Sequence, residues 1–273
     1  MNILFRHAYD IGCGFASLVW PFMKKRQKVA IENVLACGIT DDPAEARRIA
    51  KASFGHLAGH ICEAICVPAV VNAQNWREHL DVETDADPSL VKLLLESPDT
   101  PIILASSHHG VWEAATNVLS LVRPMIAIAR VQNNKFVAKW MKKYHFRGPV
   151  TVIDKSHGFT PDIMRQWKDE CAAMTILMDQ YTSGGKLLTF LGRPARTFTS
   201  VSRLAIRTGY PIVVGSFVRV APYRYRLVGG KPLKFSKEDD MAAATQLLND
   251  RLGDAIRKYP EQYLWAHRRW RDD

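Results

Sequence analysis

The segment Pro101-Ile-Ile-Leu-Ala-Ser-Ser-His-His-Gly-Val-Trp-Glu113 decides the fold, because a strand pattern and a helix pattern meet in it. Residues 101–106 form a continuous apolar run of strand length, which is typical of a buried strand. Residues 114–122 place apolar side chains at helical spacing and predict an amphipathic helix. The segment therefore predicts a strand, a turn that carries two histidines, and then a helix.

Runs of strand length and stretches of helical periodicity alternate from Pro101 onward. This alternation predicts an α/β domain with a mixed central sheet flanked by helices. Longer helices are expected over residues 42–66, after the start signal Asp41-Asp42-Pro43, and over residues 237–259. The expected strands are 101–106, 125–129, 150–153, 174–178 and 212–218, and the expected helices between them are 111–122, 133–145, 160–170 and 199–208.

His108 and Glu113 together suggest a general base. An imidazole can take a proton from a hydroxyl or an amine, and a nearby carboxylate can fix its tautomer and stabilise the cation that forms. Five positions on one helix separate side chains by roughly 140°, so His108 must precede the helix and Glu113 must lie in its first turn. His109 offers another pairing, because it is four residues from Glu113 and would share a helix face with it.

The two histidines also have plainer interpretations. A buried, hydrogen-bonded histidine followed by a glutamate at a helix start occurs for structural reasons alone. A zinc site would need a third ligand at a recognisable spacing, and the sequence offers none, so we expect no metal. The sequence also contains no glycine-rich phosphate loop, and we expect no cofactor.

The composition is that of a globular protein with a strong positive charge. The chain has 273 residues, enough for one large domain, with 47% hydrophobic and 23% charged residues. Its formal net charge of +10 indicates a negative partner, which could be nucleic acid, anionic lipid, or an acidic protein or thioester donor. The five cysteines form no C-x-x-C pair and give no sign of a disulfide framework, which favours a reducing compartment.

Residues 1–28 predict a membrane-interacting N-terminal segment. The uncharged stretch Ile11–Met23 is too short to span a bilayer. Trp20 and Phe22 stand next to the basic cluster Lys24-Lys25-Arg26-Lys28, and this combination suits a helix that lies in an anionic membrane interface. The alternative is a first helix packed on the domain with a solvated basic end.

Ordered blocks of sequence resemble the acyltransferases of lipid A biosynthesis (the lauroyl/myristoyl transferase family), which carry a His-x4-Asp/Glu motif. His108–Glu113 is similar to the family's His-Phe-Gly-Asn-Trp-Glu form, and Ala129–Asn134 resembles the arginine-bearing strand end that follows it. Met178-Asp179-Gln180 and Phe190–Ala195 resemble the Asp-Gln and Phe-Gly-Arg-Pro block. Tyr259–Trp270 resembles the C-terminal Pro-Glu-Gln-Tyr/Trp-x-Trp-x-His-Arg-Arg signature.

The resemblance covers the chain from about Arg26 to Arg271 and implies a glycerolipid-acyltransferase-like fold, with an acyltransferase domain over residues 29–273. It implies transfer of a fatty acyl group from acyl carrier protein or acyl-CoA to a hydroxyl or amine of a lipid acceptor such as a lipid A precursor. A lysophospholipid or an aminolipid is an alternative acceptor. We expect a peripheral or monotopic protein on the cytoplasmic face of the inner membrane. The chain departs from the family at His109, and its N-terminal apolar segment is weaker than the usual transmembrane helix.

Acyl transfer assigns roles to several of these residues. His108 and Glu113 would deprotonate the attacking group. Arg193 and the backbone around Gly192 are candidates to stabilise the oxyanion. Arg130, at the end of a predicted strand, could bind the phosphates of the donor or the anionic groups of the acceptor. Both arginines could instead form surface salt bridges.

Four further residues of the matching blocks are candidates for binding or for structural roles. Asp179 and Gln180 directly follow a predicted strand and should approach the same edge of the sheet as His108. Asp179 could also be a helix cap or a turn residue. His267 and Arg268 could bind a ligand, although a structural role in packing the C-terminus is favoured.

A non-enzymatic basic protein that binds membranes or nucleic acid is the alternative from another class. The lysines and arginines are dispersed, and no recognition motif with interleaved aromatic residues appears, so we expect no nucleic-acid partner. His108-His109-x3-Glu113 also echoes a motif of peptide-synthetase condensation domains, but the chain is too short for their two-lobed fold. Since acyl carrier proteins are acidic, the positive charge favours one of them over acyl-CoA as the donor.

Overall fold

The computed structural model describes residues 3–129, 150–154 and 158–271. Its strands fall into one large sheet and one separate hairpin. The strands of the sheet are β1 (Leu80–Ala86), β2 (Ile102–Ser106), β3 (Met125–Ala129), β4 (Val150–Asp154), β5 (Ala173–Leu177), β8 (Ile212–Ala221) and β9 (Arg224–Gly229). The hairpin consists of β6 (Lys186–Phe190) and β7 (Arg193–Thr197).

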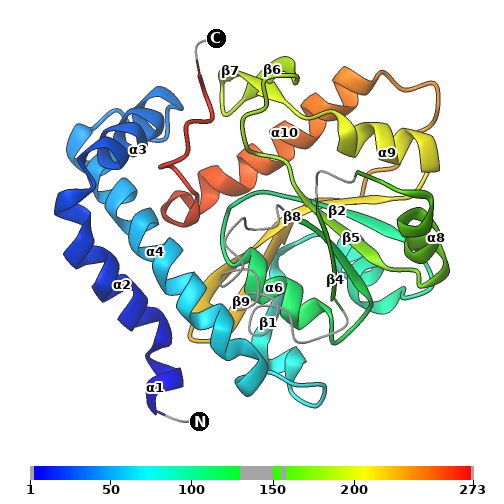
Figure 1. Ribbon diagram of the computed structural model, residues 1–273, viewed down its shortest axis with the longest axis horizontal. Coiled ribbons are helices and arrows are strands. Elements are labelled where there is room, and N and C mark those ends of the chain that lie inside the picture. The colour runs from blue at the N-terminus through cyan, green and yellow to red at the C-terminus, as the bar shows by residue number, and fades with distance from the viewer. Residues whose placement is uncertain (1–2, 130–149, 155–157, 272–273) are drawn as a thin grey trace.

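The large sheet is mixed, with the order β1-β9-β8-β2-β5-β3-β4. Strands β8, β2, β5, β3 and β4 are parallel neighbours, whereas β9 is antiparallel to β8 and parallel to β1. The predicted α/β architecture with a mixed central sheet flanked by helices is therefore confirmed (Figure 1). Each of the five strands expected from the sequence is present, within a few residues of its expected bounds.

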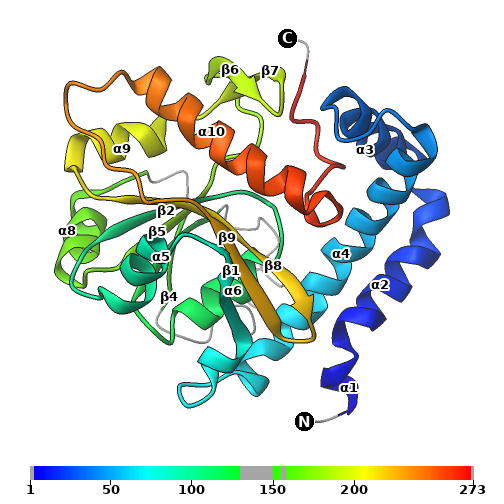
Figure 2. The same ribbon diagram turned by 180° about the vertical axis from the view of Figure 1, so that it is seen from behind.

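Helices surround the sheet on both faces (Figures 1 and 2). The expected helix over 133–145 lies outside the described residues. The α-helices of the described chain are α1 (Ile3–Arg6), α2 (Ala8–Val19), α3 (Lys24–Ala36), α4 (Pro43–Val70), α5 (Pro88–Val91), α6 (Trp112–Leu119), α8 (Pro161–Asp169), α9 (Ser200–Thr208) and α10 (Met241–Lys258). Shorter helical turns are η1 (Trp20–Phe22), η2 (Trp76–His79), η3 (Lys92–Glu96) and η4 (Pro260–Gln262).

The local sequence explains where the long helix α4 begins. The carboxylate of Asp42 accepts a hydrogen bond of 2.9 Å from the backbone N–H of Ala44, and Pro43 occupies the first helical position, where its missing N–H costs nothing. The helix continues past the expected end at residue 66 to Val70, with Pro68 in its last turn. An aspartate also caps the start of α10, where the carboxylate of Asp240 accepts from the N–H of Ala243 at 2.8 Å.

The central strand β2 is buried on both of its faces, as its unbroken apolar sequence predicts. Ile103 and Ala105 belong to the core layer under α8, α9 and α10. Ile102 and Leu104 belong to the opposite layer, which α4, α5 and α6 cover. Full burial of one such large aliphatic side chain stabilises the fold by about 1.5–3 kcal/mol.

The N-terminal helix α2 lies along the outer side of α4 (Figures 1 and 2). It turns the small residues Ala8, Gly12 and Ala16 toward the protein, where they are buried. Its other side and its flanks carry large apolar side chains that are exposed: Leu4, Ile11, Phe15, Leu18 and Phe22. No helix in the described part of the chain is long and apolar enough to cross a membrane.

Candidate active site

Two neighbouring parallel strands bring His108 and Asp179 together. Strands β2 and β5 are paired so that their last residues, Ser106 and Leu177, lie opposite each other. His108 and Asp179 each follow two residues later, at the carboxyl edge of the sheet, where open α/β sheets bind ligands. The Nδ1 atom of His108 lies 2.8 Å from Oδ1 of Asp179. The backbone N–H of His108 donates to Oδ2 of the same carboxylate at 3.0 Å, so the predicted approach of Asp179 to this edge is confirmed.

The Asp179 carboxylate fixes the protonation pattern of His108. A carboxylate accepts hydrogen bonds, so Nδ1 carries the proton, and Nε2 of the neutral ring keeps its lone pair. The side-chain nitrogen of Gln180 lies 3.2 Å from Nε2. Burial opposes the charged ring, but the charge of Asp179, with a smaller contribution from Glu113, raises the pKa of His108 above its ordinary value. The arrangement is that of a proton acceptor whose cationic form is stabilised.

Backbone hydrogen bonds hold the turn that carries His108. The carbonyl of His108 accepts from the N–H of Leu264 at 3.0 Å, and the N–H of Gly110 donates to the carbonyl of Gln262 at 2.9 Å. Gly110 has a φ of 70°, and a Cβ there would come within 1.9 Å of the carbonyl oxygen of Phe217. The turn therefore requires glycine at position 110.

Glu113 lies in the first turn of α6, as expected, but it is not the carboxylate that contacts Nδ1 of His108. From the sequence we expected Glu113 to fix the tautomer of His108, but in the structure Asp179 does this. A carboxylate oxygen of Glu113 lies 3.7 Å from Nε2 of His60 on α4. Glu113 thus acts on His108 through its charge, without the direct contact that we expected.

His109 has no part in a helix-face pairing with Glu113, because α6 begins only at Trp112. Its side chain is fully buried, and its Nε2 donates to the carbonyl of Tyr259 at 3.0 Å. Burial lowers the pKa of His109 to about 4, so the ring stays neutral. The two adjacent histidines therefore have different surroundings, and only His108 faces a carboxylate.

The predicted oxyanion residues lie on the β6–β7 hairpin. Gly192 adopts a φ of 82° in the turn between the two strands. The guanidinium of Arg193 lies 3.5 Å from the side-chain oxygen of Asn33 and 5.1 Å from the ring centre of Trp270. These contacts attach the C-terminal segment to α3, and the role of Arg193 toward an oxyanion stays a prediction. Arg130 lies outside the described residues.

The C-terminal cluster packs the chain end against the site. The backbone N–H of Tyr181 donates to Nε2 of His267 at 3.3 Å, and burial lowers the pKa of His267. Arg268 is exposed. Arg269, which belongs to the same C-terminal cluster, is buried and donates to the hydroxyl oxygen of Thr197 at 2.6 Å. The structural role favoured for this cluster agrees with these contacts.

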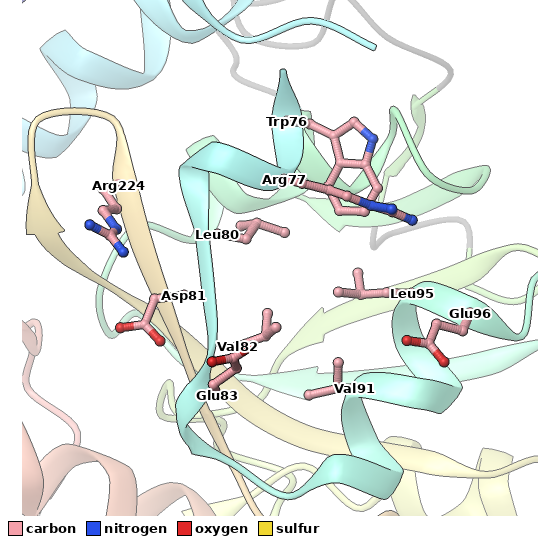
Figure 3. A pocket seen from close by; sticks show the side chains of 10 residues that line it. All are labelled: Trp76, Arg77, Leu80, Asp81, Val82, Glu83, Val91, Leu95, Glu96 and Arg224. Carbon is pink, nitrogen blue, oxygen red and sulfur yellow. The ribbon is translucent and has the colours of Figure 1, made fainter. Parts of the chain in front are cut away.

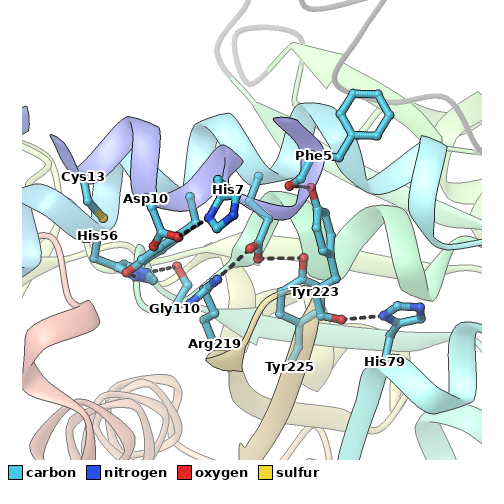
Figure 4. Close-up of polar contacts among 12 residues, drawn as sticks. Phe5, His7, Asp10, Cys13, His56, His79, Gly110, Arg219, Tyr223 and Tyr225 are labelled. Atoms are coloured by element: carbon cyan, nitrogen blue, oxygen red, sulfur yellow. Dashed lines mark hydrogen bonds and ion pairs between the residues drawn. The ribbon is translucent and has the colours of Figure 1, made fainter. Parts of the chain in front are cut away.

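Sequence reasoning missed a group of buried polar side chains on the inner face of α4. His56, His60 and Glu63 are each almost completely buried there. Figure 4 shows His56 close to Gly110, and the ring of His60 lies 4.4 Å from that of Trp112. Their spacing of four and three residues, on the same face as the apolar residues of the helix, was the signal that could have revealed them.

The hollows on the described surface include the following two. The larger, of about 430 Å³, lies between β1 and the turn η3 (Figure 3), and Trp76, Leu80, Val91 and Leu95 are among its lining residues. The smaller, of about 240 Å³, lies between the ends of α4 and α6 and is lined by Val67, Val71, Asn117 and Leu121 among others. Within the described ranges, no three His, Cys, Asp or Glu side chains come together in a way that could hold a metal ion.

An α/β sheet with a histidine–aspartate pair at its carboxyl edge has the geometry that activation of a nucleophile requires. The chain belongs to the bacterial lipid A biosynthesis acyltransferase family, whose family model matches residues 5–272. The predicted family resemblance is therefore confirmed, and the chain is an acyltransferase.

Three similar proteins are named for lipid A biosynthesis. A palmitoleoyltransferase of Escherichia coli (strain K12) is 22% identical over 283 residues, covering 96% of this chain and 84% of the relative. An acyltransferase of Shigella flexneri has the same identity and coverage. A lauroyltransferase of Escherichia coli (strain K12) is 21% identical over 274 residues, covering 96% of this chain and 85% of the relative.

Proposed function

We propose that this protein transfers a fatty acyl group from an acyl thioester to a hydroxyl or an amine of a lipid A precursor, with His108 as the general base. The observation that carries the proposal is the 2.8 Å contact between Nδ1 of His108 and Asp179, which leaves Nε2 as the basic atom. The names of the relatives, a palmitoleoyltransferase and a lauroyltransferase of lipid A biosynthesis, support the transfer of a fatty acyl group to an acceptor of that biosynthesis.

The chemistry proceeds through one tetrahedral intermediate. As the acceptor oxygen or nitrogen attacks the thioester carbonyl, Nε2 of His108 takes its proton, and Asp179 stabilises the imidazolium that results. The new carbon–oxygen or carbon–nitrogen bond forms first. The carbon–sulfur bond then breaks, and His108 returns the proton to the leaving thiolate. The histidine is thus restored at the end of each turnover.

The oxyanion of the intermediate needs a hydrogen-bond donor near Nε2. The side-chain amide of Gln180 lies 3.2 Å from that atom. When the acceptor takes the place of Gln180 beside Nε2, the amide can turn its N–H toward the oxyanion. Gln180 is therefore our first candidate, and Arg193 and Gly192 remain candidates if the β6–β7 hairpin closes over a bound substrate.

The membrane would hold this acyltransferase through its N-terminal helices. Leu4, Ile11, Phe15, Leu18 and Phe22 all lie on α1, α2 and η1, and the Phe22 side chain is 83% exposed. The next helix, α3, begins with Lys24-Lys25-Arg26, and a basic cluster beside an apolar face suits an anionic lipid surface.

Vesicle binding tests this attachment. A double variant, Phe15→Ser with Leu18→Ser, should bind vesicles of anionic phospholipid at least about tenfold more weakly, because it removes apolar area that would enter the bilayer. Leu187→Ser, at an exposed leucine of β6, is the matched control and should bind like the wild type. Equal binding by the double variant would exclude α2 as the attachment site.

The donor is expected to be an acylated carrier protein. Its acidic surface would be attracted by the net charge of +10, so transfer should slow as the salt concentration rises. Transfer of one fatty acid from the carrier protein and from coenzyme A, measured across an ionic-strength series, separates the two donors. Equal use of acyl-CoA with no salt dependence for the carrier protein would assign the positive charge to lipid binding.

The test of the proposed function is mass spectrometry of lipids extracted from cells with and without the protein. One additional acyl chain on a lipid A precursor is the expected product. The purified protein should then form the same product from an acyl thioester, and the His108→Ala variant should not. An added acyl chain on a lysophospholipid or an aminolipid would instead establish the alternative acceptor.

A further inference from the structure

A series of buried hydrogen bonds connects the N-terminal helix α2 to the turn that carries His108. The hydroxyl of Tyr9, on α2, lies 3.0 Å from Nδ1 of His56 on α4. The Nε2 atom of the same ring lies 2.9 Å from the carbonyl oxygen of Gly110, two residues after His108 (Figure 4). Three segments that are far apart in the sequence thus meet through one imidazole.

The donor and the acceptor of each of these two hydrogen bonds can be assigned. A carbonyl oxygen only accepts hydrogen bonds, so the proton of His56 is on Nε2. Burial, with the neighbouring ring of His60, lowers the pKa of His56 to about 3, and the ring is therefore neutral. Its Nδ1 must then accept the hydroxyl proton of Tyr9. Each of the two bonds polarises the ring in the direction that strengthens the other.

A second set of contacts fixes the ring of Tyr9. The guanidinium of Arg219 lies 3.7 Å from the centre of that ring. Arg219 is itself held by the buried carboxylate of Glu63 at 2.9 Å, and Glu63 accepts a further hydrogen bond of 3.1 Å from the hydroxyl of Tyr225. Because each partner is fixed by another, the Tyr9 hydroxyl has one place relative to His56.

Glycines allow α2 and α4 to approach closely enough for this contact. A Cβ on Gly12 would come within 2.5 Å of the backbone oxygen of Ala58. A Cβ on Gly59 would come within 2.8 Å of the ring of Tyr9. Gly12 and Gly59 are therefore part of the arrangement that positions Tyr9.

We propose that Tyr9 and His56 are positioning residues for acyl transfer, which hold the Gly110 carbonyl and thereby keep His108 facing Asp179. The inference rests on the proposed function and adds a second role to α2, the helix that we expect at the membrane. Without His56 the Gly110 carbonyl loses this hydrogen bond, and the bond of 2.7 Å from the N–H of Val111 to the carbonyl of Phe217 is left to hold the same peptide group. The imidazole of His108 would then reach its productive orientation in a smaller fraction of molecules.

Three variants test this inference, with acyl thioester and acceptor presented in detergent micelles. Tyr9→Phe removes only the hydroxyl and keeps the ring over Arg219. His56→Leu removes both hydrogen bonds, whereas His56→Gln supplies an amide that can donate to Gly110 and accept from Tyr9. Tyr210→Phe, at a tyrosine that packs on Trp167, is the matched control.

A positioning role predicts a loss in kcat with KM for both substrates changed by less than about twofold, since small displacements of reacting groups are costly. We expect kcat to fall about fivefold in Tyr9→Phe and about thirtyfold in His56→Leu. His56→Gln should recover most of the loss, and Tyr210→Phe should leave kcat unchanged. An unchanged kcat in Tyr9→Phe, or no recovery in His56→Gln, would overturn the inference.

Hydrogen exchange of the Gly110 and Val111 amides gives a readout that does not depend on activity. Both amides should exchange about tenfold faster in Tyr9→Phe than in the wild type or in Tyr210→Phe. If the wild type transfers no acyl group, the proposed function fails, and the exchange rates alone decide whether Tyr9 and His56 hold the turn. Wild-type exchange rates in Tyr9→Phe and in His56→Leu would show that they do not. Should His56→Leu fail to fold, Tyr9→Phe still decides the question.

Discussion

His108, at the carboxyl edge of the sheet, differs from His56 and His109, behind that edge, in the kind of group that its ring faces. His108 is 19% exposed and its ring faces the carboxylate of Asp179, which raises its pKa. His56 and His109 are buried, and their rings face the carbonyls of Gly110 and Tyr259. The pKa of these two rings is lowered, to about 3 and about 4.

The difference shows that the charge of the acceptor decides what a buried histidine can do. A carboxylate stabilises the imidazolium, so the ring can take up a proton during a reaction near neutral pH. A carbonyl accepts one hydrogen bond but cannot offset the loss of hydration, so the ring stays neutral and serves as a structural donor. One residue type thus supplies both the proposed base and its supports.

The largest effect is expected at His108. His108→Ala should lower acyl transfer by about a thousandfold or more, because the reaction loses its base, and it should also lower the thermal unfolding temperature, because the buried Asp179 carboxylate loses its side-chain partner. His109→Ala should lose less activity, although it too should lose stability, since it leaves the carbonyl of Tyr259 without its donor. Rate assays and unfolding curves on both variants check this, and an essential His109 beside a dispensable His108 would reverse our assignment.

The second comparison is between the two carboxylates. Asp179→Asn should lower kcat by about a hundredfold or more, because the amide holds the Nδ1 proton less firmly and carries no charge. Glu113→Gln should lower kcat by only about tenfold, since Glu113 acts on His108 through its charge alone. Steady-state kinetics on the two isosteric variants gives the order. A larger loss for Glu113→Gln would return the main role to the carboxylate of the His-x4-Glu motif.

Acid should destabilise the protein through the buried neutral rings. An unfolded histidine binds a proton near pH 6.5, whereas folded His109 and His56 resist protonation down to about pH 4 and about pH 3. Between these limits the unfolded state holds more protons, so stability falls as the pH falls, by about 1.4 kcal/mol per pH unit for each ring. His108 contributes in the opposite direction, because its stabilisation is present at low pH and is lost as the pH rises through its raised pKa.

Denaturant unfolding between pH 7 and pH 4 measures this slope. The variant His109→Gln cannot titrate at that position. Its free energy of unfolding should therefore change less steeply with pH, by the contribution of about one proton. An identical slope in the variant and in the wild type would mean that His109 is protonated in the folded state, and the contrast between the two sets of histidines would fail.

The smallest effect concerns the pH dependence of the rate. Because His108 must be neutral to act as a base, kcat/KM should rise with pH and level off above an apparent pKa that is higher than the ordinary value of a histidine. In Glu113→Gln this apparent pKa should move downward, since one negative charge that favours the imidazolium has been removed. A pH–rate profile on wild type and variant checks the direction, and an upward shift would contradict it.

The central strands could be predicted from the sequence because they are buried on both faces. Such strands are continuous apolar runs, and β2, β3, β5 and β8 each contain one. Strands β1, β6, β7 and β9 were not predicted, because charged or polar residues interrupt their apolar sequence, as Arg224 and Arg226 do in β9. A strand that is buried on one face only has a weaker apolar pattern in its sequence.

The part of the site that depends only on the direction of the strands could be predicted from the sequence. His108 and Asp179 follow parallel strands, and the carboxyl ends of parallel strands meet at one edge, so their approach could be expected. The pairing order of the strands could not be read, and Glu113, the carboxylate nearest in sequence, was assigned the contact that Asp179 makes. The link from Tyr9 through His56 depends on the packing of two helices against the turn, for which the sequence carries no periodic signal.

The turn that carries His108 is closed by residues synthesised more than a hundred and forty positions later. His109 donates to Tyr259, Gly110 to Gln262, and Leu264 to His108. On a translating ribosome, the strands of the sheet and the histidine–aspartate pair are synthesised before this closing segment. We therefore expect chains that stop before residue 259, such as products of a premature stop, to be folded in part yet inert, because the turn that carries His108 lacks the residues that close it.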